Sequence, residues 1–126
     1  MAATLARAAE AELIAYAAAF PGAWEDHPWD HTVMKVGAKI FVFFGGAAMP
    51  DDVLSVTVKL PISYEMALTL PYMKGAGHGL WKAGWAQLTQ HSGDDVDLVT
   101  IRGWIDQSFR AVAPKKLVKQ LDGAAA

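Results

Sequence analysis

Two short stretches of the sequence carry side chains of the kinds that bind ligands, and the first is GAWEDHPWDH at residues 22–31. Imidazole and carboxylate groups together suit zinc or iron. In this stretch Asp26, His27, Asp30 and His31 are the side chains that could act as metal ligands. A helix would place both imidazoles on one face, but Pro28 disfavours a helix here. We therefore expect a turn decorated with polar residues, with no bound metal and no cofactor.

The second stretch is the glycine-rich segment Tyr72–Trp85, YMKGAGHGLWKAGW, in which glycines surround His78, Trp81 and Lys82. Glycine-rich loops can point backbone N–H groups at an anion. Neither the dinucleotide-binding fingerprint nor the P-loop pattern is present, and both need a helix where the following run, WAQLTQ, looks like a strand. We expect a long turn whose glycines take positive φ angles. Its His78 and Lys82 should lie on the surface, while Trp85 packs into the sheet.

Lysines on strand-like runs complete the candidate site: Lys35, Lys39 and Lys59. Lysines beside aromatic rings on a sheet surface can hold phosphates while the rings stack bases. The candidate residues for binding nucleic acid or another ligand are therefore Lys35, Lys39, Lys59, His78, Trp81 and Lys82. The chain as a whole has a net charge of −2, whereas proteins that bind phosphates usually carry a positive excess. Any contact with DNA must therefore come from a local patch.

A β-hairpin is the element that positions most of these lysines. In the run Thr32–Phe44, TVMKVGAKIFVFF, two β-prone stretches meet at Gly37 and Ala38. Glycine at the first central position suits a type II′ turn. This turn predicts the facing pairs Val36–Lys39, Lys35–Ile40, Met34–Phe41 and Val33–Val42. The next strand, Val53–Leu60, should alternate between Leu54, Val56, Val58 and Leu60 on one side and Ser55, Thr57 and Lys59 on the other.

The remaining elements follow from helix periodicity and from capping and breaking residues. We expect a helix over Thr4–Phe20 capped by Thr4, a short strand at Trp24 and Glu25, a short helix in Pro61–Leu70 capped by Ser63, a strand over Trp85–Gln90, a helix over Val96–Val112 capped by Asp94 or Asp95, and a final helix beginning at Pro114. Residues 122–126 should fray. No repeat or linker divides the chain, so residues 1–126 should form one domain.

Composition narrows the class of protein. The 126 residues are 53% hydrophobic and 19% charged, which provides apolar material for one core and too little charge for disorder. The absence of cysteine excludes disulfides and thiolate chemistry and fits a reducing cytoplasm. No apolar run approaches the ~18–20 residues that span a bilayer. Glutamates interrupt the N-terminal apolar segment, whereas a signal peptide needs an unbroken apolar run there. We expect a cytoplasmic protein that does not enter a membrane.

The order of these elements and several local sequences resemble the MmcQ/YjbR family. The matching pieces lie between Ala11 and Leu121: Phe20-Pro21-Gly22, MKVGAKIFVFF, VTVKLP, SYEMALTL followed by Pro71, GHGLWKAGW, and the pair Ser108-Phe109, where the commoner partner of the serine is tyrosine. No single motif among these pieces is catalytic, and their order and spacing carry the match.

The resemblance implies an α+β fold similar to frataxin and CyaY, in which helices pack on one face of a twisted antiparallel sheet. It also implies a DNA-binding role of the kind termed double wing. Lys59, His78, Lys82 and Trp85 occupy the family's recurrent polar and aromatic positions. A frataxin-like iron role would need an acidic ridge on the first helix, where this sequence offers two glutamates.

Three classes of function are open from the sequence. The first is a non-enzymatic domain that binds DNA. The second is a protein–protein interaction module, because both faces of the hairpin are largely apolar and helices can cover only one face in a two-layer domain. The third, an enzyme, is disfavoured, because no serine lies in a nucleophile-elbow pattern and neither His31 nor His78 has an identifiable partner.

Overall fold

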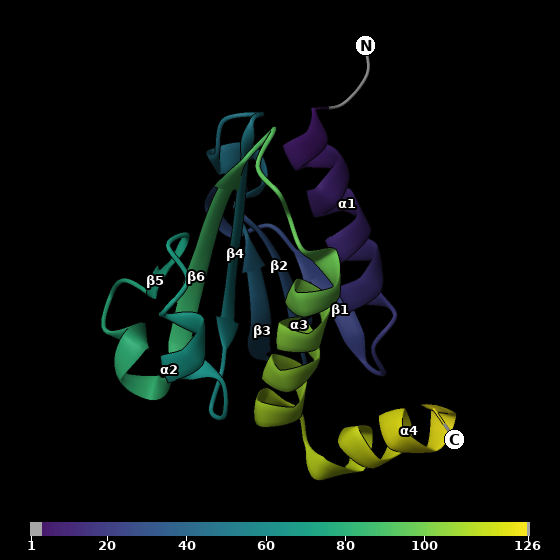
Figure 1. Cartoon of the computed structure of the whole chain (residues 1–126). Coiled ribbons are helices and arrows are strands. Elements are labelled where there is room, and N and C mark those ends of the chain that lie inside the picture. Colours follow the sequence, from purple (N-terminus) through teal and green to yellow (C-terminus); the bar gives the residue numbers. More distant parts are fainter. Residues whose placement is uncertain (1–3, 126) are drawn as a thin grey trace.

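The computed structural model describes residues 4–125, which form four α-helices and a six-stranded antiparallel sheet (Figure 1). The elements are α1 (Leu5–Ala18), β1 (Ala23–Asp26), β2 (Thr32–Val36), β3 (Lys39–Phe44), β4 (Val53–Lys59), α2 (Tyr64–Ala67), β5 (Met73–Gly75), β6 (Trp85–His91), α3 (Leu98–Val112) and α4 (Lys115–Ala125). Short 3-10 turns are η1 (Pro28–Asp30), η2 (Gly46–Ala48) and η3 (Leu80–Ala83). The strand order is β1-β2-β3-β4-β6-β5. The expected α+β class is confirmed.

The two long helices, α1 and α3, contact each other and cover the same face of the sheet, termed here the helix face (Figure 1). Strand alternation sends Leu54, Val56 and Val58 to this face, as expected. The opposite face is termed the open face. By the strand register it carries Trp24, Asp26, Val33, Lys35, Ile40, Phe43, Ser55, Thr57, Lys59, Lys74, Trp85, Gln87 and Thr89. The fold thus places the two long helices on one face, as the resemblance to the MmcQ/YjbR family implies.

The core lies between the helix face and the helices that cover it. The ring centroid of Phe109, on α3, lies 4.8 Å from that of Phe20 and 5.2 Å from that of Phe41. α3 buries a stripe of apolar side chains at Ile101, Ile105 and Phe109, each of which is at most 2% exposed. Burial of such side chains stabilises the fold by about 1.5–3 kcal/mol each.

The hairpin of β2 and β3 turns at Gly37 as expected, but its register changes two pairs further on. Gly37 has a φ of 61°, a conformation that glycine adopts without strain. The two pairs nearest the turn are those predicted, Val36–Lys39 and Lys35–Ile40. A β-bulge at Phe41 then shifts the pairing to Met34–Val42 and Val33–Phe43, so the predicted pairs Met34–Phe41 and Val33–Val42 are wrong.

The bulge decides which side chains enter the core. Because one strand has an extra residue there, Phe41 and Val42 both pack into the core cluster, and Phe43 turns to the open face. The run KIFVFF does not indicate this bulge, since it is apolar at almost every position and lacks the alternation that would mark the register.

Ser108 of α3 ties the bulge to the neighbouring strand. Its hydroxyl donates to the carbonyl oxygen of Phe41 at 2.5 Å and accepts from the backbone N–H of Lys59 at 2.9 Å. The side chain is fully buried. It thus satisfies two backbone groups beside the end of the β3–β4 ladder, whose last pair on this side is Val42–Val58.

Helix capping follows the sequence at one site and differs at two. Thr4 caps α1 by accepting a hydrogen bond from the N–H of Arg7. The cap of α3 is Asp97, which accepts from the N–H of Thr100 at 3.1 Å, so the expectation of Asp94 or Asp95 is wrong. Ser63 holds the N-cap position of α2, as predicted, but its side chain makes no capping hydrogen bond to the helix. Its hydroxyl instead accepts from the Gln107 side chain of α3 at 2.9 Å, because tertiary packing supplies a different partner.

The glycine-rich segment is more regular than the expected long turn. Its first part forms β5, which pairs with β6, and η3 follows. A three-residue edge strand leaves no periodic signal, so its existence depends on the neighbouring β6. Gly79 and Gly84, at the two ends of η3, have positive φ angles, as predicted for this segment.

The C-terminal helix α4 completes the fold. Residues 122–125, expected to fray, continue α4, and Ala126 lies outside the described residues. Leu117 and Leu121 of α4 pack against the core cluster. Within residues 4–125, no helix combines the length and apolar character needed to cross a bilayer.

Candidate nucleic-acid interface

A groove with a volume of about 470 Å³, termed here the open-face groove, lies on the open face between two loops. Open-face side chains form its floor: Phe43, Ser55, Thr57 and Gln87. Two loops contribute its rims, with Trp29 and His31 on one and Gly77, His78 and Leu80 on the other. These loops connect β1 to β2 and β5 to β6, which are the strand pairs at opposite ends of the sheet. The groove therefore spans the middle of the open face.

The floor of the groove combines an aromatic ring with polar groups. Phe43, Thr57 and Gln87 are direct neighbours across β3, β4 and β6. The side-chain amide of Gln87 donates to the hydroxyl of Ser55 at 3.3 Å. Within the described chain, the structure gives no hydrogen-bond partner for the Gln87 carbonyl oxygen or for the Thr57 hydroxyl. The floor thus offers an acceptor and a hydroxyl that a ligand can engage.

Both rims hold the backbone in an unusual conformation. Among residues 4–125, the non-glycine residues with positive φ are Trp29 at 48°, Asp30 at 65° and His78 at 57°. All three lie in the two loops that border the groove. Each such conformation costs on the order of 1–3 kcal/mol, and strain of this kind clusters at functional sites. Trp29 is also 91% exposed, so its ring contributes little to the core.

Trp85 supports the floor from the side. It is 9% exposed, and its ring meets the ring of Phe43 edge to face, with centroids 5.6 Å apart. The expectation that Trp85 packs into the sheet is confirmed. This contact holds Phe43 in place beneath the groove, since edge-to-face pairs are a favoured aromatic geometry.

Lys35 is engaged within the protein. Its Nζ lies 2.7 Å from the Asp26 carboxylate and 5.1 Å from the centroid of the Trp24 ring. The hydrogen bond from Lys35, together with one from the His27 backbone N–H, holds the pKa of Asp26 below its ordinary value. Lys35 is therefore the least available of the predicted lysines.

Lys39 and Lys59 share a different pocket. Together with Trp85 they line a space of about 360 Å³ that also includes residues near the end of α3. Lys39 is exposed and Lys59 is half-buried. The structure therefore brings these two predicted residues together beside the hairpin turn.

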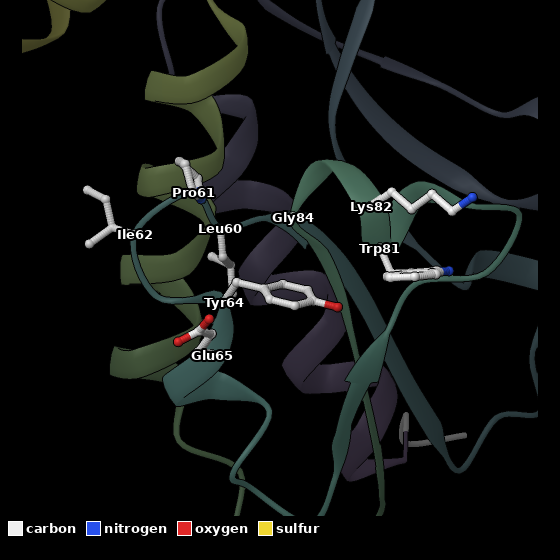
Figure 2. Close-up of a pocket in the computed structure, with 8 residues that line it drawn as sticks. All are labelled: Leu60, Pro61, Ile62, Tyr64, Glu65, Trp81, Lys82 and Gly84. Carbon is white, nitrogen blue, oxygen red and sulfur yellow. The ribbon is translucent and has the colours of Figure 1, made fainter.

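Trp81 and Lys82 line a third space, of about 540 Å³, with Tyr64 and Glu65 of α2 (Figure 2). The hydroxyl of Tyr64 points toward the indole of Trp81, and Lys82 lies over that indole with its Nζ 5.7 Å from the ring centroid. Gly75 makes this packing feasible, because a Cβ there would lie 2.8 Å from both the Trp81 Cβ and the Tyr64 hydroxyl oxygen.

The structure thus does not gather the six predicted residues in one place. His78 reaches the open-face groove, and the other residues lie at the hairpin end, at α2 or in an ion pair with Asp26. Lys74 was missed by the sequence reasoning. It is exposed on β5 directly across from Gln87, and it could not be placed without knowing that β5 is a strand.

The polar cluster before β2 does not converge on a metal site. The Nε2 of His27 lies 2.5 Å from the Glu25 carboxylate, while Asp26 is held by Lys35. His31 lies on the rim of the groove. In the part of the chain that the structure describes, no three His, Asp or Glu side chains are grouped as metal ligands.

Comparison with known proteins identifies relatives of the sequence and of the fold. The family model described as YjbR matches residues 18–111. A crystal structure of a protein from Pseudomonas syringae superposes with a TM-score of 0.61 at 20% sequence identity, covering 81% of this chain and 97% of that one. No curated protein sequence is significantly similar to the chain. The structural likeness supports the fold.

Proposed function

The chain belongs to the YjbR family, and we propose that it is a non-enzymatic domain that binds DNA through the open face of its sheet. The observation that carries this proposal is that Lys74 and Lys59 lie on the open face, next to floor residues of the groove in the strand register. Lys74 lies directly across from Gln87, and Lys59 lies two residues beyond Thr57 on the same face. Among the lysines that the structure describes, Lys35 is the one that forms a salt bridge. Lys59 and Lys74 are therefore available to phosphate groups.

The distribution of carboxylates supports the same surface. On the strands of the open face the acidic residue is Asp26, and its negative charge is neutralised by the ion pair with Lys35. Asp30 lies in η1, between the rim residues Trp29 and His31. Many other acidic residues lie in loops or on helices: Asp51, Asp52, Asp94, Asp95, Asp97, Asp106 and Asp122. The strands of the open face carry three lysines, Lys35, Lys59 and Lys74, against Asp26, whereas the whole chain has a net charge of −2. A local excess of basic side chains is the arrangement that phosphate binding requires.

A salt titration tests the proposal. Fluorescence anisotropy with a labelled DNA oligonucleotide should show binding at 50 mM salt that weakens steeply by 200 mM. Lys74→Ala should bind more weakly, with a slope of log K against log salt that is shallower by about one. Lys116→Ala, which removes an exposed lysine from α4, is the matched control and should bind like wild type. Wild-type protein without affinity for any DNA at low salt would overturn the proposal.

A second candidate function is protein–protein interaction at α2. The hairpin offers limited apolar surface for this, because Val42 and Phe44 pack in the core, Val33 is buried, and Ile40 and Phe43 on the open face are half-buried. Instead, two apolar side chains that line the space shown in Figure 2 are exposed, Ile62 at 86% and Trp81 at 50%, and Met66 of α2 is 77% exposed. Exposed apolar clusters of this kind mark interaction sites.

Sedimentation velocity tests this second candidate in its simplest form, association between copies of the chain. Association through the apolar cluster should persist at high salt, because apolar contacts are not screened, and Ile62→Asp should abolish it. A wild-type protein that remains monomeric at high concentration would contradict self-association through this surface.

A further inference from the structure

We infer that the open-face groove holds unpaired nucleobases, so that the nucleic acid this domain prefers is single-stranded. The inference rests on the proposed function and specifies its ligand. It follows from three features of the groove: the chemistry of its floor, the exposed ring on its rim and the lysines beside it.

The floor matches the chemistry of a base. A nucleobase presents an apolar face and a polar edge, and the floor presents the ring of Phe43 next to the side chains of Thr57 and Gln87. A glutamine amide offers a donor and an acceptor side by side, which suits the edge of a base. The volume of about 470 Å³ falls within the ~300–1,000 Å³ typical of small-molecule sites. The groove is thus large enough for a base and lined for one.

The rim supplies a ring that the fold does not need. Trp29 is 91% exposed, and the backbone holds it at a φ of 48°. An exposed tryptophan in a strained conformation at the border of a groove is poorly explained by stability, because it buries little apolar area. Stacking on a base would use its face, and aromatic side chains are the usual platforms for successive unpaired bases.

A duplex cannot use these features. In double-stranded DNA the faces of the bases are stacked and their pairing edges are engaged, so a ring on a rim and a polar floor have nothing to contact unless a base leaves the helix. Sheet surfaces with exposed aromatic rings are a known solution for single strands. Lys74 and Lys59 lie beside the floor where the backbone of such a strand would run.

Comparison of matched single-stranded and duplex oligonucleotides tests the inference. Fluorescence anisotropy with 12-nucleotide oligothymidine and oligoadenosine, and with the duplex that they form, should show single strands binding at least tenfold more tightly than the duplex. The RNA strands of the same sequences show whether the sugar matters, since the 2′-hydroxyl is what distinguishes RNA from DNA. Preference for either sugar is consistent with the inference, provided that the single strand is preferred.

Two tryptophan variants locate the binding. Trp29→Ala should weaken single-strand binding about tenfold, since stacking contributes on the order of 1–3 kcal/mol per base. Trp81→Ala is the matched control, because Trp81 is also exposed but lies outside the groove, and it should bind within twofold of wild type. Thermal melting by circular dichroism should show that Trp29→Ala is folded.

The outcomes separate the inference from the proposed function. Equal affinity for duplex and single strands, or an unchanged affinity in Trp29→Ala, would overturn the inference and leave the proposed DNA binding standing. An absence of binding to every oligonucleotide would overturn both. A tenfold loss in Trp29→Ala, with Trp81→Ala near wild type, supports both.

Discussion

The two faces of the sheet differ in the kinds of side chain that they carry and in how deeply these side chains are buried. On the helix face, Phe41 and Phe44, together with Phe109 of the covering helix α3, are at most 1% exposed and are surrounded by other apolar groups. On the open face, apolar, polar and basic side chains alternate, and the most exposed ring, Trp29, stands on a strained loop beside it. The first face is explained by packing, whereas the second contains features that packing does not require. This difference points to the open face as the functional surface.

The largest effect should follow from a change on the helix face. Phe109→Ala removes a ring that contacts Phe20 and Phe41, and it should lower the free energy of unfolding by about 3–5 kcal/mol. Urea denaturation monitored by circular dichroism measures this change. A loss below about 1 kcal/mol would show that the core does not depend on this ring cluster. Any folded fraction of the variant should still bind DNA like wild type.

Trp85→Ala tests the boundary between the two faces. Trp85 belongs to the open face but is 9% exposed and packs on Phe43. Its removal should therefore reduce the free energy of unfolding by about 3 kcal/mol and should also loosen the floor of the groove. Denaturation and DNA binding should both change. A variant that loses binding while its stability is unaffected would show that Trp85 contacts the ligand directly.

Ser108→Ala should have an intermediate effect. It leaves the Phe41 carbonyl and the Lys59 N–H without their bridging hydroxyl, and a buried polar group without a partner costs about 1–3 kcal/mol. Urea denaturation again gives the value, and hydrogen exchange at Lys59 should become faster. If exchange at Lys59 stays as slow as in wild type, the hydroxyl is not what protects that amide.

Asp26→Asn should have the smallest effect on stability and the opposite effect on binding. The pKa of Asp26 is lowered in the folded state, so its contribution to stability is present above its ordinary pKa and is lost as the pH falls through the lowered value. The stability difference between wild type and variant should therefore shrink in acid.

The same variant releases Lys35 and removes a negative charge from the open face. At neutral pH it should bind DNA more tightly, with a salt dependence steeper by about one phosphate contact. Weaker binding by Asp26→Asn would contradict the assignment of this face.

The sequence predicted the elements better than it predicted their pairing. The turn at Gly37 and the strand at Val53–Lys59 could be read from local chemistry, because glycine, alternation and β-branched residues act over a few positions. The bulge at Phe41 and the short strand β5 could not, since they depend on which strands become neighbours. Their positions are set by tertiary packing.

The open-face groove could be predicted from the sequence even less than the strand pairing. Its floor residues Phe43, Thr57 and Gln87 are separated by many positions and meet only through the register of three strands. Trp29 was read as part of a polar turn, and nothing in the sequence signals its positive φ. The residues that the sequence did indicate, among them Trp81 and Lys82, stand out because glycines surround them, but they lie at a different pocket.

The most direct test of the open face as the binding surface is a chemical-shift titration. Uniformly ¹⁵N-labelled protein would be titrated with 12-nucleotide oligothymidine at low salt, and the amide shifts would be mapped on the sheet. The largest changes should fall on Trp29, His78 and the floor residues Phe43, Thr57 and Gln87, with α1 and α4 unaffected. Changes confined to α2 and the Trp81 pocket, or the absence of changes at saturating oligonucleotide, would contradict the assignment.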